Sequence, residues 1–213
     1  IKNCQTIEKI NKENIIFVDF EFLPGIKNAN NTSGCIYLIG LTMKNTGECL
    51  QWMIGQEEDL FFGERRIVRE FIKWIDINTP SCLVHWSHAE QSQLKKAFCR
   101  HNFQLHRLRE IPWFDLLKVF KDNAIAIPGC YTYKLKDITT ALCKSGDLSF
   151  SYEDIDCGNA EDSMIQALKY YNRFCKTVNY EYDLSEEIME YNEMDCRVLN
   201  SIGKWVGCWN DSD

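Results

Sequence analysis

The segment NIIFVDFEF (residues 14–22) determines how the rest of the chain is interpreted. Its β-branched and aromatic residues predict a strand that is buried at the centre of a sheet. Because side chains two positions apart on a strand point to the same face, Asp19 and Glu21 are expected side by side. Two carboxylates on one face of a core strand repel each other unless a cation lies between them. The alternative is that Glu21 already lies in the following loop and that Asp19 alone points inward.

Four more strands and five main helices are expected after this segment. The strands are predicted at residues 35–42, 48–54, 81–86 and 111–114, and the helices at 57–75, 89–101, 134–143, 160–175 and 185–206. The order is a three-stranded meander, then helix, strand, helix, strand, and then helices. Three antiparallel strands followed by parallel β-α-β additions are typical of an α/β, ribonuclease-H-like mixed sheet with flanking helices, although other α/β folds share this order.

Two further acidic positions stand out in the expected helices. In YNEMD (residues 191–195), Tyr191 and Asp195 are four positions apart and therefore share a helix face next to the apolar stripe. A solvated acidic face is the alternative, because four glutamates lie close by. Glu90 follows the strand at 81–86 in the first turn of a helix, where the helix dipole tolerates a carboxylate. By itself, Glu90 is more simply a helix-start glutamate.

In combination these motifs resemble the DEDD exonuclease superfamily, which has D-x-E on its first strand, an acid after its fourth strand and Y-x-x-x-D on its last helix. VDFEF matches the first motif, and YNEMD matches the third in its tyrosine variant. The middle motif departs from the common N-x-x-x-D, because Trp86 and Glu90 occupy the Asn and Asp positions. This variant is similar to the YprB-type branch, as are the stretches HWSHAEQSQL, WFDLL and YTYKLKDI.

The resemblance implies a 3′–5′ exonuclease that hydrolyses phosphodiester bonds of single-stranded or 3′-end nucleic acid with two divalent cations, Mg²⁺ or Mn²⁺. Asp19 would bridge both cations, and Glu21 and Asp195 would complete the first site. Glu90 would hold the second cation directly or through water, and Tyr191 would orient the attacking water. Hard oxygen ligands favour these two metals over zinc.

Residues that contact the substrate are less clear from the sequence. The candidates are Phe22, Leu23, His88, Lys95, Lys134 and Lys136. Cations beside aromatic residues suit phosphate contacts and base stacking on single strands. A solvated helix surface explains the lysines equally well, and Phe22 and Leu23 are equally compatible with the core. Asp115, between a strand and a helix, is interpreted as a helix N-cap.

Bulk properties limit the setting of the protein. Residues 1–213 are expected to form one exonuclease domain, excised from a longer protein because the chain begins with Ile. The resemblance implies a fused or associated helicase or other nucleic-acid-processing domain as partner, besides nucleic acid. The apolar runs are too short to span a membrane. Eleven cysteines without a C-x-x-C pair indicate free thiols and a reducing intracellular location, the cytoplasm or nucleus.

Two other functions stay open at this point. A ribonuclease-H-like endonuclease would use the same residues for internal cleavage, and a catalytically silent module would only bind nucleic acid or protein. The net charge of −7 neither supports nor excludes a nucleic-acid partner, because a local basic face can coexist with an acidic remainder. The choice between DNA and RNA depends on contacts to the 2′-hydroxyl, which the sequence does not show.

Overall fold

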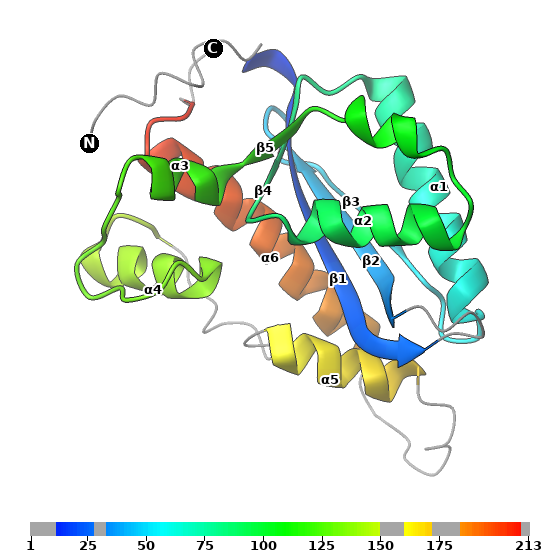
Figure 1. Cartoon of the computed structure of the whole chain (residues 1–213). Helices are drawn as coiled ribbons and strands as arrows, with labels where there is room; N and C mark the ends of the chain where they lie inside the picture. The colour runs from blue at the N-terminus through cyan, green and yellow to red at the C-terminus, as the bar shows by residue number, and fades with distance from the viewer. Residues whose placement is uncertain (1–11, 28–32, 150–159, 172–183, 210–213) are drawn as a thin grey trace.

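A five-stranded mixed sheet forms the centre of the computed structural model, which describes residues 12–27, 33–149, 160–171 and 184–209 (Figure 1). The strands lie in the order β3-β2-β1-β4-β5. Their bounds are β1 (Ile15–Lys27), β2 (Ser33–Met43), β3 (Cys49–Met53), β4 (Cys82–His85) and β5 (Trp113–Asp115). β1 occupies the middle of this order, as its continuous apolar run predicted.

The pairing of the strands confirms the predicted fold class. β1 pairs antiparallel with β2, and β2 pairs antiparallel with β3. β1 and β4 are parallel, as are β4 and β5. Asp19 lies opposite Gly40, and Glu21 lies opposite Leu38. Glu21 is therefore within the strand, and the alternative that placed it in a loop is wrong.

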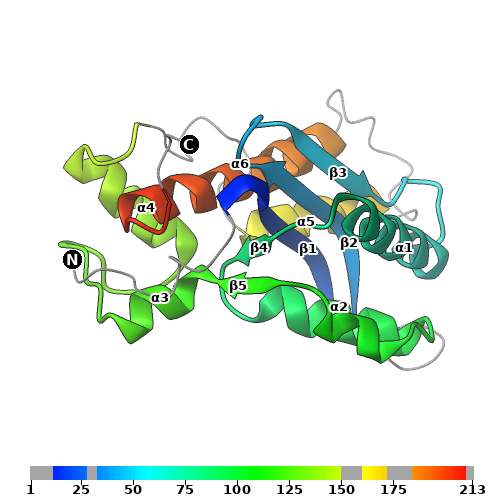
Figure 2. The ribbon, with the colours of Figure 1, turned by 90° about the horizontal axis from the view of Figure 1, so that it is seen from above.

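Six α-helices lie among the described residues. They are α1 (Leu60–Asn78), α2 (Ala89–Arg100), α3 (Leu116–Asp122), α4 (Leu135–Ser145), α5 (Ala160–Tyr171) and α6 (Leu184–Trp205). Single 3₁₀ turns lie at Lys12–Asn14 and Leu105–Arg109. Figure 2 shows α2 and α6 on opposite sides of β1. None of the helices within the described ranges combines the length and apolarity needed to cross a membrane.

The two faces of β1 pack into different clusters. Ile16, Val18 and Phe20 belong to the core cluster that contains the buried residues of α1 and α2. Ile15 and Phe17 belong to the cluster that contains α3, α4 and the second half of α6. Because side chains alternate along a strand, Asp19 and Glu21 share the face of Ile15 and Phe17.

Local caps set the loops at the carboxyl ends of β4 and β5. Asp115 is the N-cap of α3, as predicted, and it accepts a hydrogen bond from the backbone N–H of Lys118 at 3.3 Å. The same oxygen of Asp115 accepts from the backbone N–H of Ser87 at 3.0 Å. Ser87 has φ of 73°, a left-handed conformation that non-glycine residues rarely adopt. The capping aspartate therefore also fixes the sharp turn that leads into α2 and Glu90.

Within the described ranges, no disulfide cross-links the fold. Eight cysteines lie in the described ranges, and all eight are free thiols. Four of them, Cys35, Cys82, Cys196 and Cys208, are buried and pack as small apolar residues.

A buried ion cluster joins α1 to α2. The carboxylate of Glu64 accepts from Arg100 Nε and faces His101 Nε2, both at 2.8 Å, and the three side chains are almost fully enclosed. Glu64 also accepts from the backbone N–H of Ile36 on β2 at 2.8 Å. Because buried charges are tolerated only when they are paired, this cluster fixes α2 against α1 and β2.

Replacing Glu64 by Ala is expected to lower the free energy of unfolding by about 3–5 kcal/mol, because it leaves a guanidinium buried without its carboxylate. Chemical denaturation of the variant and the wild type measures this difference. Glu70→Ala on the same helix is the control, since Glu70 is partly exposed and pairs at the surface with Arg66. Its loss should stay below about 1 kcal/mol. Equal losses in the two variants would contradict the importance of the buried cluster.

Candidate metal centre

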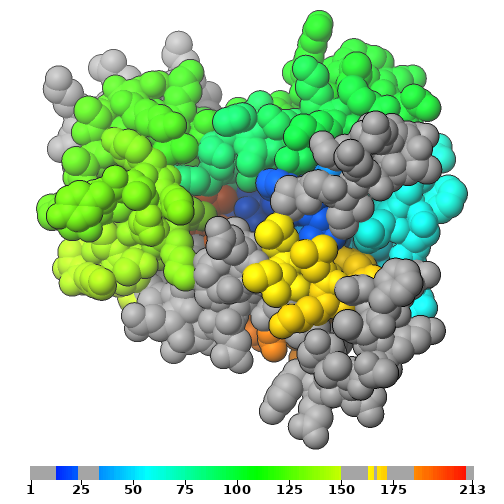
Figure 3. All heavy atoms as spheres, turned by 60° about the horizontal axis from the view of Figure 1, so that its bottom comes forward, coloured from blue at the N-terminus to red at the C-terminus, as the bar shows by residue number. Residues whose placement is uncertain are grey.

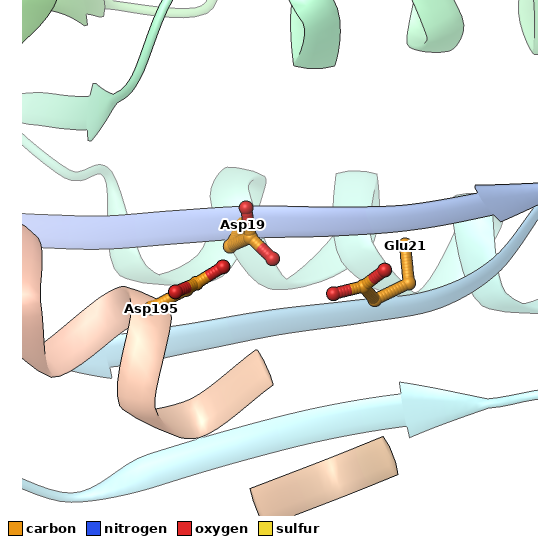
Figure 4. Close-up of side chains that lie close together, drawn as sticks. All are labelled: Asp19, Glu21 and Asp195. Carbon is orange, nitrogen blue, oxygen red and sulfur yellow. The ribbon is translucent and has the colours of Figure 1, made fainter. Parts of the chain in front are cut away.

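Three of the predicted acidic residues meet in space. Asp19 and Glu21 from β1 and Asp195 from α6 each offer a carboxylate oxygen, and these oxygens all lie within 4.8 Å of one another (Figure 4). Glu21 and Asp195 are 7% and 8% exposed, and Asp19 is partly exposed. The period of two on β1 and the position of α6 across its face bring these residues together, although α6 begins 157 positions after β1 ends.

The face of the molecule near this cluster is hollowed. Figure 3 shows the hollow between α2, α5 and the region of α3 and α4, with β1 in part of its floor. A ligand that approaches the carboxylates from solvent would enter through this hollow, which is bordered by segments that lie far apart in the chain.

The carboxylates of the cluster need a compensating positive charge to be ionised together. Burial, together with the charges of Asp195, Glu21 and Glu90, raises the pKa of Asp19 well above its ordinary value. Burial and then the charge of Asp195 raise the pKa of Glu21 from 4.5 to about 8. Carboxylates so placed are ionised at neutral pH only when a cation compensates them. The all-oxygen donor set fits a hard divalent ion such as Mg²⁺ or Mn²⁺.

Glu90, the fourth predicted carboxylate, lies beside the cluster. It is buried in the first turn of α2, and its carboxylate is not among the oxygens that lie within 4.8 Å of one another. Its charge still contributes to the raised pKa values of Asp19 and Glu21, so it is within electrostatic range. Its own pKa is raised by burial, and the neighbouring His85 opposes that shift.

His85 is a structural partner of Glu90. Its Nδ1 lies 3.3 Å from Glu90 Oε2, and its Nε2 lies 3.0 Å from Gln91 Nε2. Because the amide of Gln91 donates to Nε2, the ring proton belongs on Nδ1, the nitrogen near Glu90. The complete burial of His85 agrees with a structural role.

Tyr191 lies against the cluster, as the helical spacing predicted. Its side chain is buried, and burial raises the pKa of its hydroxyl, with further increases from the charges of Asp195, Glu21 and Asp19 and from a hydrogen bond with Asp195. The phenol therefore stays neutral at physiological pH and keeps a proton to donate.

Asn192, which the sequence did not single out, supports Asp19. Asn192 Nδ2 donates to Asp19 Oδ2 at 2.8 Å and to the Asp19 backbone carbonyl at 3.2 Å. Gln51 on β3 donates to Asn192 Oδ1 at 3.1 Å and to the backbone carbonyl of Met189 at 2.7 Å. A Cβ at Gly40 would lie 1.7 Å from Asn192 Oδ1, so only glycine fits there. The position inside YNEMD was the only signal for this residue.

Tyr37 and Ser163 support Glu21 and were also missed. The Tyr37 hydroxyl donates to Glu21 Oε2 at 3.3 Å, Ser163 Oγ donates to the same oxygen at 3.2 Å, and the two hydroxyls are 2.9 Å apart. The register of β1 and β2 shifts between Glu21 and Phe22, so that pairing passes from Leu38 to Ile36 and skips Tyr37. Such a bulge redirects a side chain relative to the regular alternation.

The residues predicted to bind substrate divide into two groups. Leu23 is 1% exposed and belongs to the core, and Phe22 is partly buried against that core, which is the alternative that the sequence left open. The other four, His88, Lys95, Lys134 and Lys136, are exposed or partly exposed. Leu23 is therefore closed to a ligand in solution, whereas the second group is open to one.

The raised pKa of Glu21 predicts a pH-dependent stability difference from a Glu21→Gln variant in EDTA. The folded state keeps Glu21 protonated up to about pH 8, whereas the unfolded chain releases this proton near pH 4.5. The wild type therefore loses stability as pH rises between these values, and the neutral glutamine does not. Chemical denaturation at a series of pH values should show the variant gaining relative stability from pH 5 to pH 8. Parallel profiles would contradict the shift.

Comparison with known proteins supports the fold. A solved structure of the family B DNA polymerase from the hyperthermophilic archaeon Pyrobaculum calidifontis matches with a TM-score of 0.64 and 10% sequence identity. The match covers 90% of this chain and 24% of the polymerase chain, so this chain spans about a quarter of the polymerase's length. At this identity the similarity shows the fold alone. A search of curated proteins finds no match.

A family model covers most of the chain. The model described as the RNase H superfamily matches residues 16–207, a stretch that runs from the second residue of β1 to beyond the end of α6. This chain belongs to the RNase H superfamily.

Proposed function

We propose that this domain, residues 1–213, is a metal-dependent 3′–5′ exonuclease of the YprB-type branch of the DEDD group. It hydrolyses phosphodiester bonds of single-stranded or 3′-end nucleic acid. The supporting observation is the buried group of Asp19, Glu21 and Asp195, with oxygens within 4.8 Å of one another, in a fold of the RNase H superfamily. The fold similarity to a DNA polymerase agrees with a nucleic-acid substrate.

The resemblance to the DEDD exonucleases gives each carboxylate a role towards two cations. Asp19 would bridge both cations; Glu21 and Asp195 would complete one site, and Glu90 would contribute to the other directly or through water. Two divalent cations neutralise the charge of the transferring phosphoryl group, lower the pKa of a bound water and stabilise the leaving alkoxide. Mg²⁺ and Mn²⁺ suit this all-oxygen donor set.

The chain's own side chains then orient the reactants. The neutral Tyr191 hydroxyl, beside Asp195, would hold the attacking water by a hydrogen bond. Asn192 fixes the carboxylate plane of Asp19, and Tyr37 with Ser163 fixes that of Glu21. Ligands held in this way keep their geometry when substrate arrives, and such supporting bonds raise both metal affinity and rate.

Replacing Asp19 or Asp195 by Asn should reduce Mg²⁺- or Mn²⁺-dependent digestion of a labelled oligonucleotide to background, because each change removes a charged ligand at nearly constant volume. Product ladders on a gel follow the reaction. Glu193→Gln is the matched control: Glu193 lies in the same motif but pairs with Arg197 at the surface. Near-full activity of either aspartate variant would refute the assigned roles.

The same assay separates the alternative functions. An exonuclease needs an end, so a circular single strand should resist digestion, whereas a ribonuclease-H-like endonuclease would cut it. A protein that binds Mn²⁺ or oligonucleotide but never cleaves would be a silent binding module. Matched DNA and RNA oligonucleotides identify the preferred sugar. We also propose a fused or associated helicase domain and a reducing intracellular location.

Asn192→Ala should lower activity by about 10- to 100-fold, the usual effect of losing a bond that orients a metal ligand. It should also raise the Mn²⁺ concentration that gives half-maximal activity. Gly40→Ala should act in the same direction, because its Cβ displaces the Asn192 side chain. A lower melting temperature with an unchanged Mn²⁺ requirement would show that Asn192 serves only the fold.

A further inference from the structure

We infer that the loop of residues 125–133, here called the tyrosine loop, forms a binding site for one unpaired nucleobase of the nucleic-acid strand. The inference rests on the proposed function and specifies its substrate as a single strand with an accessible base. The tyrosine loop joins α3 to α4, on the side of the molecule that carries neither α1 nor α2 (Figure 1).

A small cavity lies against the tyrosine loop. It has a volume of about 140 Å³, and its lining includes the buried apolar residues Phe120, Ile127 and Ile138 together with the rings of Tyr131 and Tyr133. Pockets for drug-sized ligands usually have about 300–1,000 Å³. The cavity is therefore suited to a single ring system rather than to a complete cofactor.

The two tyrosines differ in their freedom. Tyr133 is 41% exposed, and its hydroxyl donates to the backbone carbonyl of Ile125 at 3.4 Å, which holds its ring across the loop. Tyr131 is 96% exposed although it lines the same cavity. A large aromatic ring that is exposed beside an apolar cavity offers a stacking surface. Single strands are bound without regard to sequence when their bases stack on such rings.

Trp86 connects this site to the candidate metal centre. Its indole Nε1 donates to the Tyr133 carbonyl at 2.9 Å, and its ring packs edge-on against Phe120, with centroids 5.3 Å apart. Trp86 directly follows His85, whose Nδ1 faces Glu90. The same short segment at the carboxyl end of β4 therefore contacts the lining of the cavity through Trp86 and Glu90 through His85.

The local charge favours a polyanion. Residues 116–149 contain five lysines and three aspartates, a net charge of +2 in a chain whose net charge is −7. Lys134 follows Tyr133 directly and is exposed. Exposed lysines next to a stacking surface can contact the phosphates on either side of a bound base. An apolar partner would not require this charge, so the observations favour a nucleic-acid strand.

The test is binding in EDTA, where hydrolysis is absent, measured by fluorescence anisotropy with a labelled single-stranded oligonucleotide. Tyr131→Ala should weaken binding on the order of 5- to 150-fold, the effect of losing one base stack. Tyr131→Phe should bind like the wild type. Phe62→Ala is the matched control, because Phe62 is an exposed aromatic residue on α1 that does not line this cavity.

An otherwise identical strand with abasic positions gives the decisive comparison. If Tyr131 stacks on a base, Tyr131→Ala and the wild type should bind the abasic strand equally. An equal loss of affinity for both strands, or no loss for the normal strand, would overturn the inference.

Hydrolysis with Mn²⁺ is measured separately. If the wild type cleaves the strand but Tyr131→Ala binds it like the wild type, the base site is rejected and the proposed nuclease function stands. If Tyr131→Ala weakens binding but the wild type does not cleave, the base site is supported and the nuclease function is rejected.

Discussion

Mutual repulsion among carboxylates in one buried space is the constraint on which the candidate site depends. Asp19, Glu21 and Asp195 have oxygens within 4.8 Å of one another, and burial strengthens the repulsion because little water screens it. The surrounding residues respond in two ways. Asn192, Tyr37 and Ser163 donate hydrogen bonds that favour the charged forms of Asp19 and Glu21. These hydrogen bonds do not neutralise the negative charge of the three carboxylates. The folded protein therefore keeps a destabilising arrangement that a bound cation can relieve.

The two faces of β1 differ in their packing, and this difference limits the effect of the repulsion on the fold. One face of β1 contributes Ile16, Val18 and Phe20 to the core that contains α1 and α2, and this packing does not depend on the carboxylates. The other face begins as core and becomes the site towards the carboxyl end of the strand. The Glu64 cluster secures α2 on the first face. One face of β1 is thus core at Ile16, Val18 and Phe20, whereas the other is core at Ile15 and Phe17 and carries the carboxylates beyond them.

Local periodicity made part of this structure predictable from the sequence. The period of two on β1 placed Asp19 beside Glu21, and the helical period placed Tyr191 beside Asp195. The contacts that support these residues were not predictable, because they join segments far apart in the chain: Ser163 lies 142 positions from Glu21, and Gln51 lies 141 from Asn192. Tyr37 reaches Glu21 at a bulge, which breaks the alternation on which strand patterns rest. The pairing of Glu90 with His85 likewise needed the turn at Ser87.

The close approach of Gly40 to Asn192 has a consequence for sequence change. A methyl group at position 40 would overlap the amide of Asn192, whereas a smaller residue at position 192 would leave room for it. Substitutions at these two positions, 152 residues apart, are therefore not independent: each alone disturbs Asp19, and only a joint change restores the packing. Descendants of this sequence should keep the glycine and the asparagine together or lose both, so their covariation would record the geometry of the site.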